Sequence, residues 1–137
     1  MRAILEPEIA ALAAIRVEEC HLAAMREAFS VMDRSREDPA AFIEADLDFH
    51  LALAEAAANP LILSLIDSIV DLLREQRIRI FHVEGGPERG QLHHTRILEA
   101  IESRNVEKAR AAMRAHLEQV REDSKSSQAQ PLAKKAS

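Results

Sequence analysis

The sequence predicts an all-α protein, an antiparallel bundle of six helices, and three observations support this. Of its 137 residues 47% are apolar, yet Trp and Tyr are absent and only three Gly and five Pro interrupt the chain. The abundant Ala, Leu, Glu and Arg lose little free energy on entering a helix. The apolar residues recur at helical spacing, and the β-branched residues fall within the same pattern, so no strand is indicated.

The first three helices are expected over residues 2–16, 18–36 and 39–58. Breaks are placed where the apolar spacing is interrupted by residues that stop or cap a helix. The third helix follows Asp38, a favourable N-cap residue. It has Pro39 in its first turn, where the missing N–H of proline costs nothing.

The last three helices are expected over residues 60–81, 88–103 and 106–123. Asn59-Pro60 separates the fourth helix from the third, and Gly85-Gly86-Pro87 separates it from the fifth. The connection between the fifth and sixth helices is very short, which implies that they are antiparallel neighbours.

Residues 1–123 are expected to form one domain, which agrees with the length of the chain. Residues 124–137 are mainly Ser, Gln, Lys and Ala without apolar periodicity. Such a segment buries too little apolar surface to offset the entropy of ordering it. We therefore expect a disordered polar tail.

Charge and cysteine content restrict the classes of function. The net charge is −5 and no stretch concentrates Lys and Arg, so we do not expect the chain alone to bind DNA. The single cysteine, Cys20, cannot close an internal disulfide, and no secretion signal is evident. No apolar run reaches the roughly 18 residues of a membrane span. We expect a cytoplasmic protein without membrane contact.

Asp46 and His50 are four residues apart in the third helix, so their side chains project from one face about one turn apart. That face continues through apolar residues in both directions. Asp48, by contrast, shares its side of the helix with Glu44 and Glu55. We expect Asp46 and His50 to point into the core and Asp48 to point into solvent.

Two further histidines are predicted to face inward. His94 shares its helical stripe with Ile97, whereas the adjacent His93 lines up with Arg96 and is expected to face water. His116 lies on the apolar side of the last helix.

These inward-facing polar groups favour one shared divalent-metal site. A buried polar group without a partner costs roughly 1–3 kcal/mol, and a common ion would satisfy all of them. The alternative is that each histidine is an ordinary hydrogen-bonded core residue. Imidazoles with one carboxylate suit zinc first, and also Ni, Co, Fe or Mn, and they can leave coordination positions open. The predicted ligands are Asp46, His50, His94 and His116.

Arg77 continues the apolar line of Val70 and Leu73 and is a candidate to bind a carboxylate through paired hydrogen bonds. The alternatives are that it reaches solvent near the helix end or pairs with a buried Glu. The role of Arg2 is equally undecided, because its spacing from Glu6 also permits an ordinary surface ion pair.

Several segments together carry a family resemblance. They are Arg2-Ala-Ile-Leu-Glu-Pro-Glu with Leu12-Ala-Ala, Asp46-Leu-Asp-Phe-His50, Ala57-Ala-Asn59-Pro60, His94-Thr-Arg-Ile-Leu-Glu-Ala-Ile101, and Ala109 with Met113-Arg-Ala-His-Leu117. Over about residues 1–123 the chain resembles the C-terminal ligand-binding domain of FadR-type regulators in the GntR family, called the FCD domain.

The resemblance implies an antiparallel bundle of six or seven helices in which an Asp and three His bind a metal at the floor of an effector cavity. The matching positions are the predicted ligands. It also implies that small carboxylate effectors change how a dimeric repressor, here a homodimer, engages its operator. Arg77, Arg2 and Asn59 are the candidate effector-binding residues.

Family members carry a winged helix-turn-helix before this domain, and nothing in this sequence can supply its recognition helix. DNA binding is therefore expected only through a winged-helix domain that this chain lacks. We expect a piece of a longer regulator; a solitary sensor acting through a partner is the alternative.

The sequence thus predicts a non-catalytic, metal-dependent sensor of small carboxylates. One alternative is a small metallohydrolase, because an open zinc site lowers the pKa of bound water. That reading lacks a general base, since no second inward carboxylate is evident beside Asp46. The other alternative is a metal-free helical dimerisation module.

Overall fold

Seven helices and short connections form the part of the chain that this computed structural model describes, residues 2–129, with side chains described over 4–127. No strand occurs in these residues, so the predicted all-α class is confirmed. The helices are α1 (Arg2–Arg16), α2 (Glu19–Arg34), α3 (Pro39–Ala56), α4 (Pro60–Ser68), α5 (Val70–Phe81), α6 (Gly86–Glu102) and α7 (Val106–Ala129).

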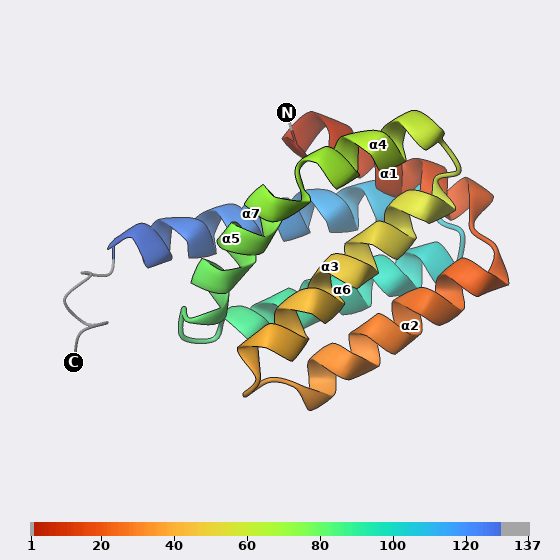
Figure 1. Cartoon of the computed structure of the whole chain (residues 1–137). Helices are drawn as coiled ribbons and strands as arrows, with labels where there is room; N and C mark the ends of the chain where they lie inside the picture. The colour runs from red at the N-terminus through yellow and green to blue at the C-terminus, as the bar shows by residue number, and fades with distance from the viewer. Residues whose placement is uncertain (1, 130–137) are drawn as a thin grey trace.

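The helices form a bundle around α3 (Figure 1). α3 packs against α2, α1 and α5, and α7 packs against α1 and α6. The largest core cluster takes its side chains from α1, α2, α3, α6 and α7, with Met25, Phe49 and Ile97 fully enclosed. Segments far apart in the sequence therefore share one interior. Among the described residues no helix combines the length and apolar character that crossing a membrane requires.

The fourth predicted helix, residues 60–81, is divided into α4 and α5 at Ile69, whose backbone is not helical. Ile62 and Ile66 on α4 pack toward α1 and the end of α3, whereas Leu73 on α5 packs on the middle of α3. The same apolar stripe thus covers two differently oriented surfaces. Periodicity misses the break because the residues on either side of it keep the same register.

The turn between α5 and α6 depends on both of its glycines. Gly85 has a φ of 74°, a left-handed conformation that glycine adopts without steric cost. A Cβ atom on Gly86 would clash with the carbonyl oxygen of Ile80. The helix therefore begins at Gly86, slightly before the predicted start, and lies close under the end of α5.

The last helix continues past Asp123, where the apolar pattern ends. This corrects the predicted boundary of the tail, because residues 124–129 are helical. The extension is held against α5, since Gln76 Nε2 donates a hydrogen bond to Ser124 Oγ at 3.1 Å. The rest of the expected tail, residues 130–137, lies outside the described residues.

Candidate functional site

Three helices bring one carboxylate and three imidazoles together in the centre of the bundle. α3 supplies Asp46 and His50, α6 supplies His94 and α7 supplies His116. Each of these residues is at most 8% exposed. One ring nitrogen from each histidine lies within 4.8 Å of the other two. The inward direction expected for all four side chains is confirmed.

The Nε2 atoms of His50 and His94 lie beside the Asp46 carboxylate, and that of His116 lies beside His50. Asp46 Oδ1 lies 3.3 Å from His50 Nε2 and 3.4 Å from His94 Nε2. His116 Nε2 lies 3.3 Å from His50 Nε2. Asp46 Oδ1 and His94 Nε2 are buried without a hydrogen-bond partner in the described part of the chain. Lone pairs this close repel one another unless a proton or a cation lies among them.

The surroundings set the protonation states of the cluster. Burial opposes ionisation of Asp46, but the Arg77 guanidinium and the His94 ring outweigh it and hold the pKa of Asp46 well below its usual range. Burial lowers the pKa of His50, although Asp46 opposes this, and burial lowers the pKa of His116 still more strongly. An ionised carboxylate and neutral imidazoles are the states that metal coordination requires.

The distances in the cluster fit a shared metal ion. Bonds of about 2.0–2.1 Å from zinc to imidazole nitrogen or carboxylate oxygen place donor atoms on one ion about 3.0–3.4 Å apart. Three of the separations, at 3.3–3.4 Å, fall in this range, and the donor nitrogens of the three histidines all lie within 4.8 Å of one another. An ion would also provide a partner for the two unpartnered atoms. The residues that could hold it are Asp46, His50, His94 and His116.

Arg77 lies inside the bundle, as its helical register predicts, and is 4% exposed. Its Nε lies 3.2 Å from Asp46 Oδ2, and its Nη1 donates to Gln76 Oε1 at 3.2 Å. The alternatives of a solvent-directed Arg or one paired with Glu are therefore wrong. Its Nη2 is buried and, among the described residues, has no hydrogen-bond partner.

A cavity borders the cluster, with polar groups at one end and apolar walls. Gly90 of α6 lies one turn before His94, and a Cβ atom built on it would meet nothing within 4 Å. The space beside the cluster is thus left open at this position. The lining residues are Phe42, Asp46, Arg77, Ile80, Phe81, Gly86, Pro87, Gly90, His94, His116, Gln119 and Val120.

The other two candidate effector residues are not brought into this cavity. Asn59 caps α4, where its side chain accepts a hydrogen bond from the Leu61 N–H at 3.0 Å, and it is not one of the lining residues. Arg2 is the first residue of α1, and its side chain lies outside the described residues.

His93 is half-buried, which corrects its expected position in solvent. Its ring centroid lies 6.0 Å from that of His116, and its Nδ1 is buried without a partner in the described chain. Burial, followed by the nearby Arg96, lowers its pKa. The helical wheel of α6 alone places His93 beside arginines, but α7 covers that side of the helix.

Glu6 is a buried acidic residue whose inward position the sequence analysis missed. It is 6% exposed and lines a second small cavity beside His50 and Met113. The expectation that Asp46 is the only inward carboxylate is therefore wrong. The signal was present, because Glu6 shares its stripe on α1 with the buried Ile9 and Ala13. This cavity is distinct from the one that Arg77 lines.

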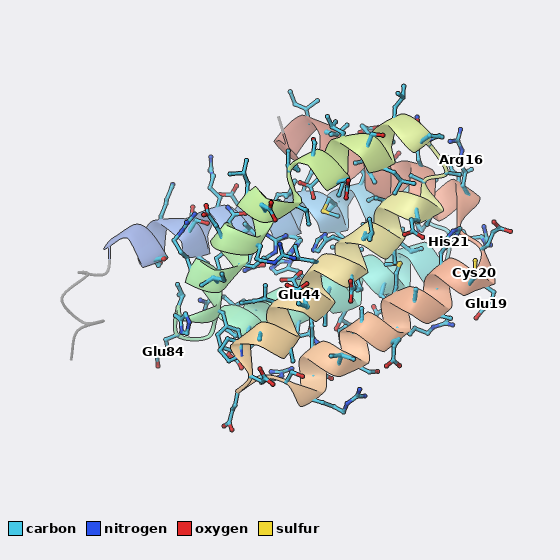
Figure 2. All side chains as sticks on the ribbon, viewed as in Figure 1. Arg16, Glu19, Cys20, His21, Glu44 and Glu84 are labelled. Atoms are coloured by element: carbon cyan, nitrogen blue, oxygen red, sulfur yellow. The ribbon has the colours of Figure 1, made fainter. Side chains whose placement is uncertain are left out.

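Of the remaining polar candidates, Glu44 lies on α3, and Cys20 and His21 lie at the beginning of α2 (Figure 2). Glu44 pairs with Arg74 at 2.9 Å on the surface, on the outer side of α3 where it is predicted. Cys20 is exposed, and the ring of His21 accepts a hydrogen bond from the Glu18 N–H at 3.1 Å at the beginning of α2. His21 thus has a structural role.

The structure is thus a small helical domain with a buried carboxylate–histidine cluster beside a cavity that one arginine lines. Comparison with known proteins is more specific: the FCD domain model matches residues 1–119, and the chain belongs to this family.

The relatives are transcription regulators. The chain is 34% identical over 125 residues to the HTH-type transcriptional regulator LutR of Bacillus subtilis (strain 168), covering 88% of this chain and 57% of that protein. It is 29% identical over 129 residues to the HTH-type transcriptional repressor NanR of Salmonella newport (strain SL254), covering 88% and 47%. The chain thus spans about half the length of these relatives.

The fold agrees with this assignment. A solved structure described as Streptococcus agalactiae GntR matches with a TM-score of 0.72 and 27% identity, over 88% of this chain and 55% of that one. The chain is an effector-binding domain of the GntR-regulator type, and this kind of domain is regulatory and not enzymatic.

Acid should destabilise the metal-free protein. The pKa values of His50 and His116 are lowered in the fold. Below the ordinary value of 6.5 the unfolded chain therefore binds protons that the folded chain does not, so the free energy of unfolding falls as the pH falls. We expect a loss of up to about 1.4 kcal/mol per pH unit for each ring. Urea unfolding of chelator-treated protein from about pH 7.5 to about pH 5.5 measures this slope.

Two variants test whether the buried histidines cause this dependence of the free energy of unfolding on pH. His116→Asn should make it shallower, whereas His82→Asn, at an exposed position, should leave it unchanged. The same slope in all three proteins would show that the buried rings do not control acid stability.

Proposed function

We propose that this chain is the metal-dependent sensor of small carboxylates in a GntR-type regulator. The main support is that Asp46 and two of the histidines line the same cavity as Arg77, whose Nη2 is buried without a hydrogen-bond partner among the described residues. The ligands would be Asp46 and the three histidines. An ion held there would supply positive charge, and an ion that takes five or six ligands would keep a position for the effector.

Charge supports a carboxylate as the effector. Asp46 and Arg77 neutralise each other, so a bound divalent ion would leave an excess of positive charge in a buried site. A carboxylate entering the cavity would offset that excess and could accept from Arg77 Nη2. The cavity is about 20 Å³ in this structure, so an acid could enter only if the cavity walls moved apart. Hydroxy acids, sugar acids and dicarboxylates are the classes to test.

The donor set is rich in nitrogen, which favours zinc and also suits Ni, Co, Fe or Mn over the oxygen-seeking Mg and Ca. His94→Ala should weaken zinc binding by at least about 100-fold, because it removes one ligand from the centre of the cluster. Competition of the chelator-stripped protein against a zinc indicator measures the dissociation constant.

The control for zinc binding is His82→Ala, since this exposed histidine lies at the end of α5 and outside the cluster. It should bind zinc as the wild type does. Wild-type protein that fails to bind near-stoichiometric zinc would overturn the metal centre and would favour a metal-free dimerisation module.

Gly90→Leu should abolish the response to carboxylates while zinc binding is retained. The added side chain would occupy the open space beside Gly90 but would not replace a ligand. Gly90→Ala should also raise thermal stability, because glycine in a helix interior costs about 1 kcal/mol relative to alanine. A thermal-shift screen of carboxylates on zinc-loaded protein measures the response.

The control is Glu99→Leu, at an exposed position on the same helix. It should respond to carboxylates as the wild type does. A carboxylate-induced shift that survives in Gly90→Leu would place the effector site elsewhere.

The sensor is proposed to act as a homodimer in the cytoplasm, with DNA bound only through a winged-helix domain outside this sequence. Exposed apolar side chains on α1, α4 and α5, namely Ile4, Leu61 and Leu72, at 68–79% exposure, support an association surface. Leu61→Glu should shift the protein to monomer in sedimentation-velocity experiments. A wild-type monomer at all accessible concentrations would contradict the dimer.

A further inference from the structure

We propose that Gln91 and Gln119 are positioning residues that fix the ring tautomers of His94 and His116, so that both present a bare Nε2 to the cluster. Each glutamine joins a histidine to a carboxylate on its other side. This inference rests on the proposed metal centre, but the tautomers can be measured without any metal.

The first relay links α2 to α6. Gln91 Nε2 donates to Asp33 Oδ1 at 2.9 Å and to the carbonyl oxygen of Phe29 at 3.3 Å. Both of these groups are acceptors only. The amide nitrogen of Gln91 must therefore point toward α2, which leaves its oxygen facing the ring: Gln91 Oε1 lies 2.9 Å from His94 Nδ1.

The second relay runs along α7 and ends on α6. Gln119 Nε2 donates to Asp123 Oδ2 at 2.7 Å, and Gln119 Oε1 lies 3.1 Å from His116 Nδ1. Asp123 is 4% exposed and is held by Arg89, whose Nη2 lies 2.6 Å from Asp123 Oδ1. The carboxylate again fixes which way the amide points.

The tautomer of each ring follows from these contacts. An amide oxygen can only accept, so Nδ1 of His94 and of His116 must carry the hydrogen. In a neutral imidazole the other nitrogen then bears a lone pair. That nitrogen is Nε2, which lies 3.4 Å from Asp46 Oδ1 for His94 and 3.3 Å from His50 Nε2 for His116.

The two relays share the same construction. In each, a glutamine three residues from its histidine on the same helix face turns its oxygen to the ring. An arginine at the outer end pairs with the carboxylate, at 2.9 Å for Arg36 and Asp33 and at 2.6 Å for Arg89 and Asp123. Ring orientation inside the bundle is thus anchored to ion pairs at its surface.

Gln119→Met tests the second relay, since methionine keeps the length of the side chain and removes the acceptor. We expect zinc binding to weaken by about 10- to 100-fold, the usual effect of losing a group that orients a metal ligand. In ¹⁵N spectra of the metal-free protein, His116 should change from the Nδ1–H tautomer to a mixture. Gln91→Met should do the same for His94.

Gln76→Met is the matched control, because the Gln76 amide bonds to Arg77 and Ser124 and not to an imidazole. It should leave both ring tautomers unchanged. The Gln119→Glu/Asp123→Asn double variant exchanges amide and carboxylate but still offers His116 an acceptor. It should recover most of the zinc affinity that Gln119→Met loses.

If Gln91→Met does not fold, Asp33→Asn takes its place, since it removes the charge that orients the Gln91 amide at a half-exposed position. It should weaken zinc binding several-fold. Wild-type rings protonated on Nε2, or zinc affinities unchanged in the glutamine variants, would overturn the relays. Wild-type protein with Nδ1–H rings that binds no zinc would overturn the metal centre instead.

Discussion

The interior of this bundle depends on the ion pair between Asp46 and Arg77. Asp46 Oδ2 and Arg77 Nε lie 3.2 Å apart, and neither side chain reaches solvent appreciably. Leaving either charge buried alone would cost on the order of 3–5 kcal/mol, so the pair requires α5 to lie over α3. It also keeps Asp46 ionised in spite of burial, with a pKa well below the usual range. Asp46 and Arg77 neutralise each other, so this pair can be buried without an ion.

The sequence predicted the part of the site that depends on one helix at a time. Asp46 and His50 are buried and Asp48 is exposed, as the register of α3 requires. The same test placed His94 on the inner face of α6 and Arg77 on the inner face of α5. Four inward polar groups on an otherwise apolar face are a strong signal, because each would be costly without a partner. This cost favoured one shared site, and the family resemblance supported it, but the mutual rotation of the helices was not derivable from spacing.

Most of the features that sequence reasoning missed depend on contacts between helices, with Glu6 as the exception because it lies on an apolar stripe of α1. His93 is half-buried because α7 covers its side of α6. The amide of Gln91 owes its orientation to Asp33, which is 58 positions away in the chain. The apolar spacing continues unchanged across the break at Ile69, so the sequence pattern does not reveal the break. Periodicity reports which side of a helix is apolar, but it does not report what packs there.

In the proposed sensor, different helices contribute the metal ligands and the effector-binding arginine, and this difference suggests how effector binding could change the structure. The candidate metal ligands come from α3, α6 and α7, whereas Arg77 comes from α5. A ligand shifts a conformational equilibrium only by its differential affinity for the two states. A carboxylate that engages both the ion and Arg77 would favour arrangements in which α5 lies close to the other three helices. α5 is bounded by the non-helical Ile69 and by the turn at Gly85, so its position is set by packing and not by continuity with its neighbours. The two glutamine relays, by contrast, tie His94 and His116 to ion pairs on α2, α6 and α7. In the proposed sensor the metal side of the cavity would therefore be the fixed reference, and the placement of α5 would report the effector.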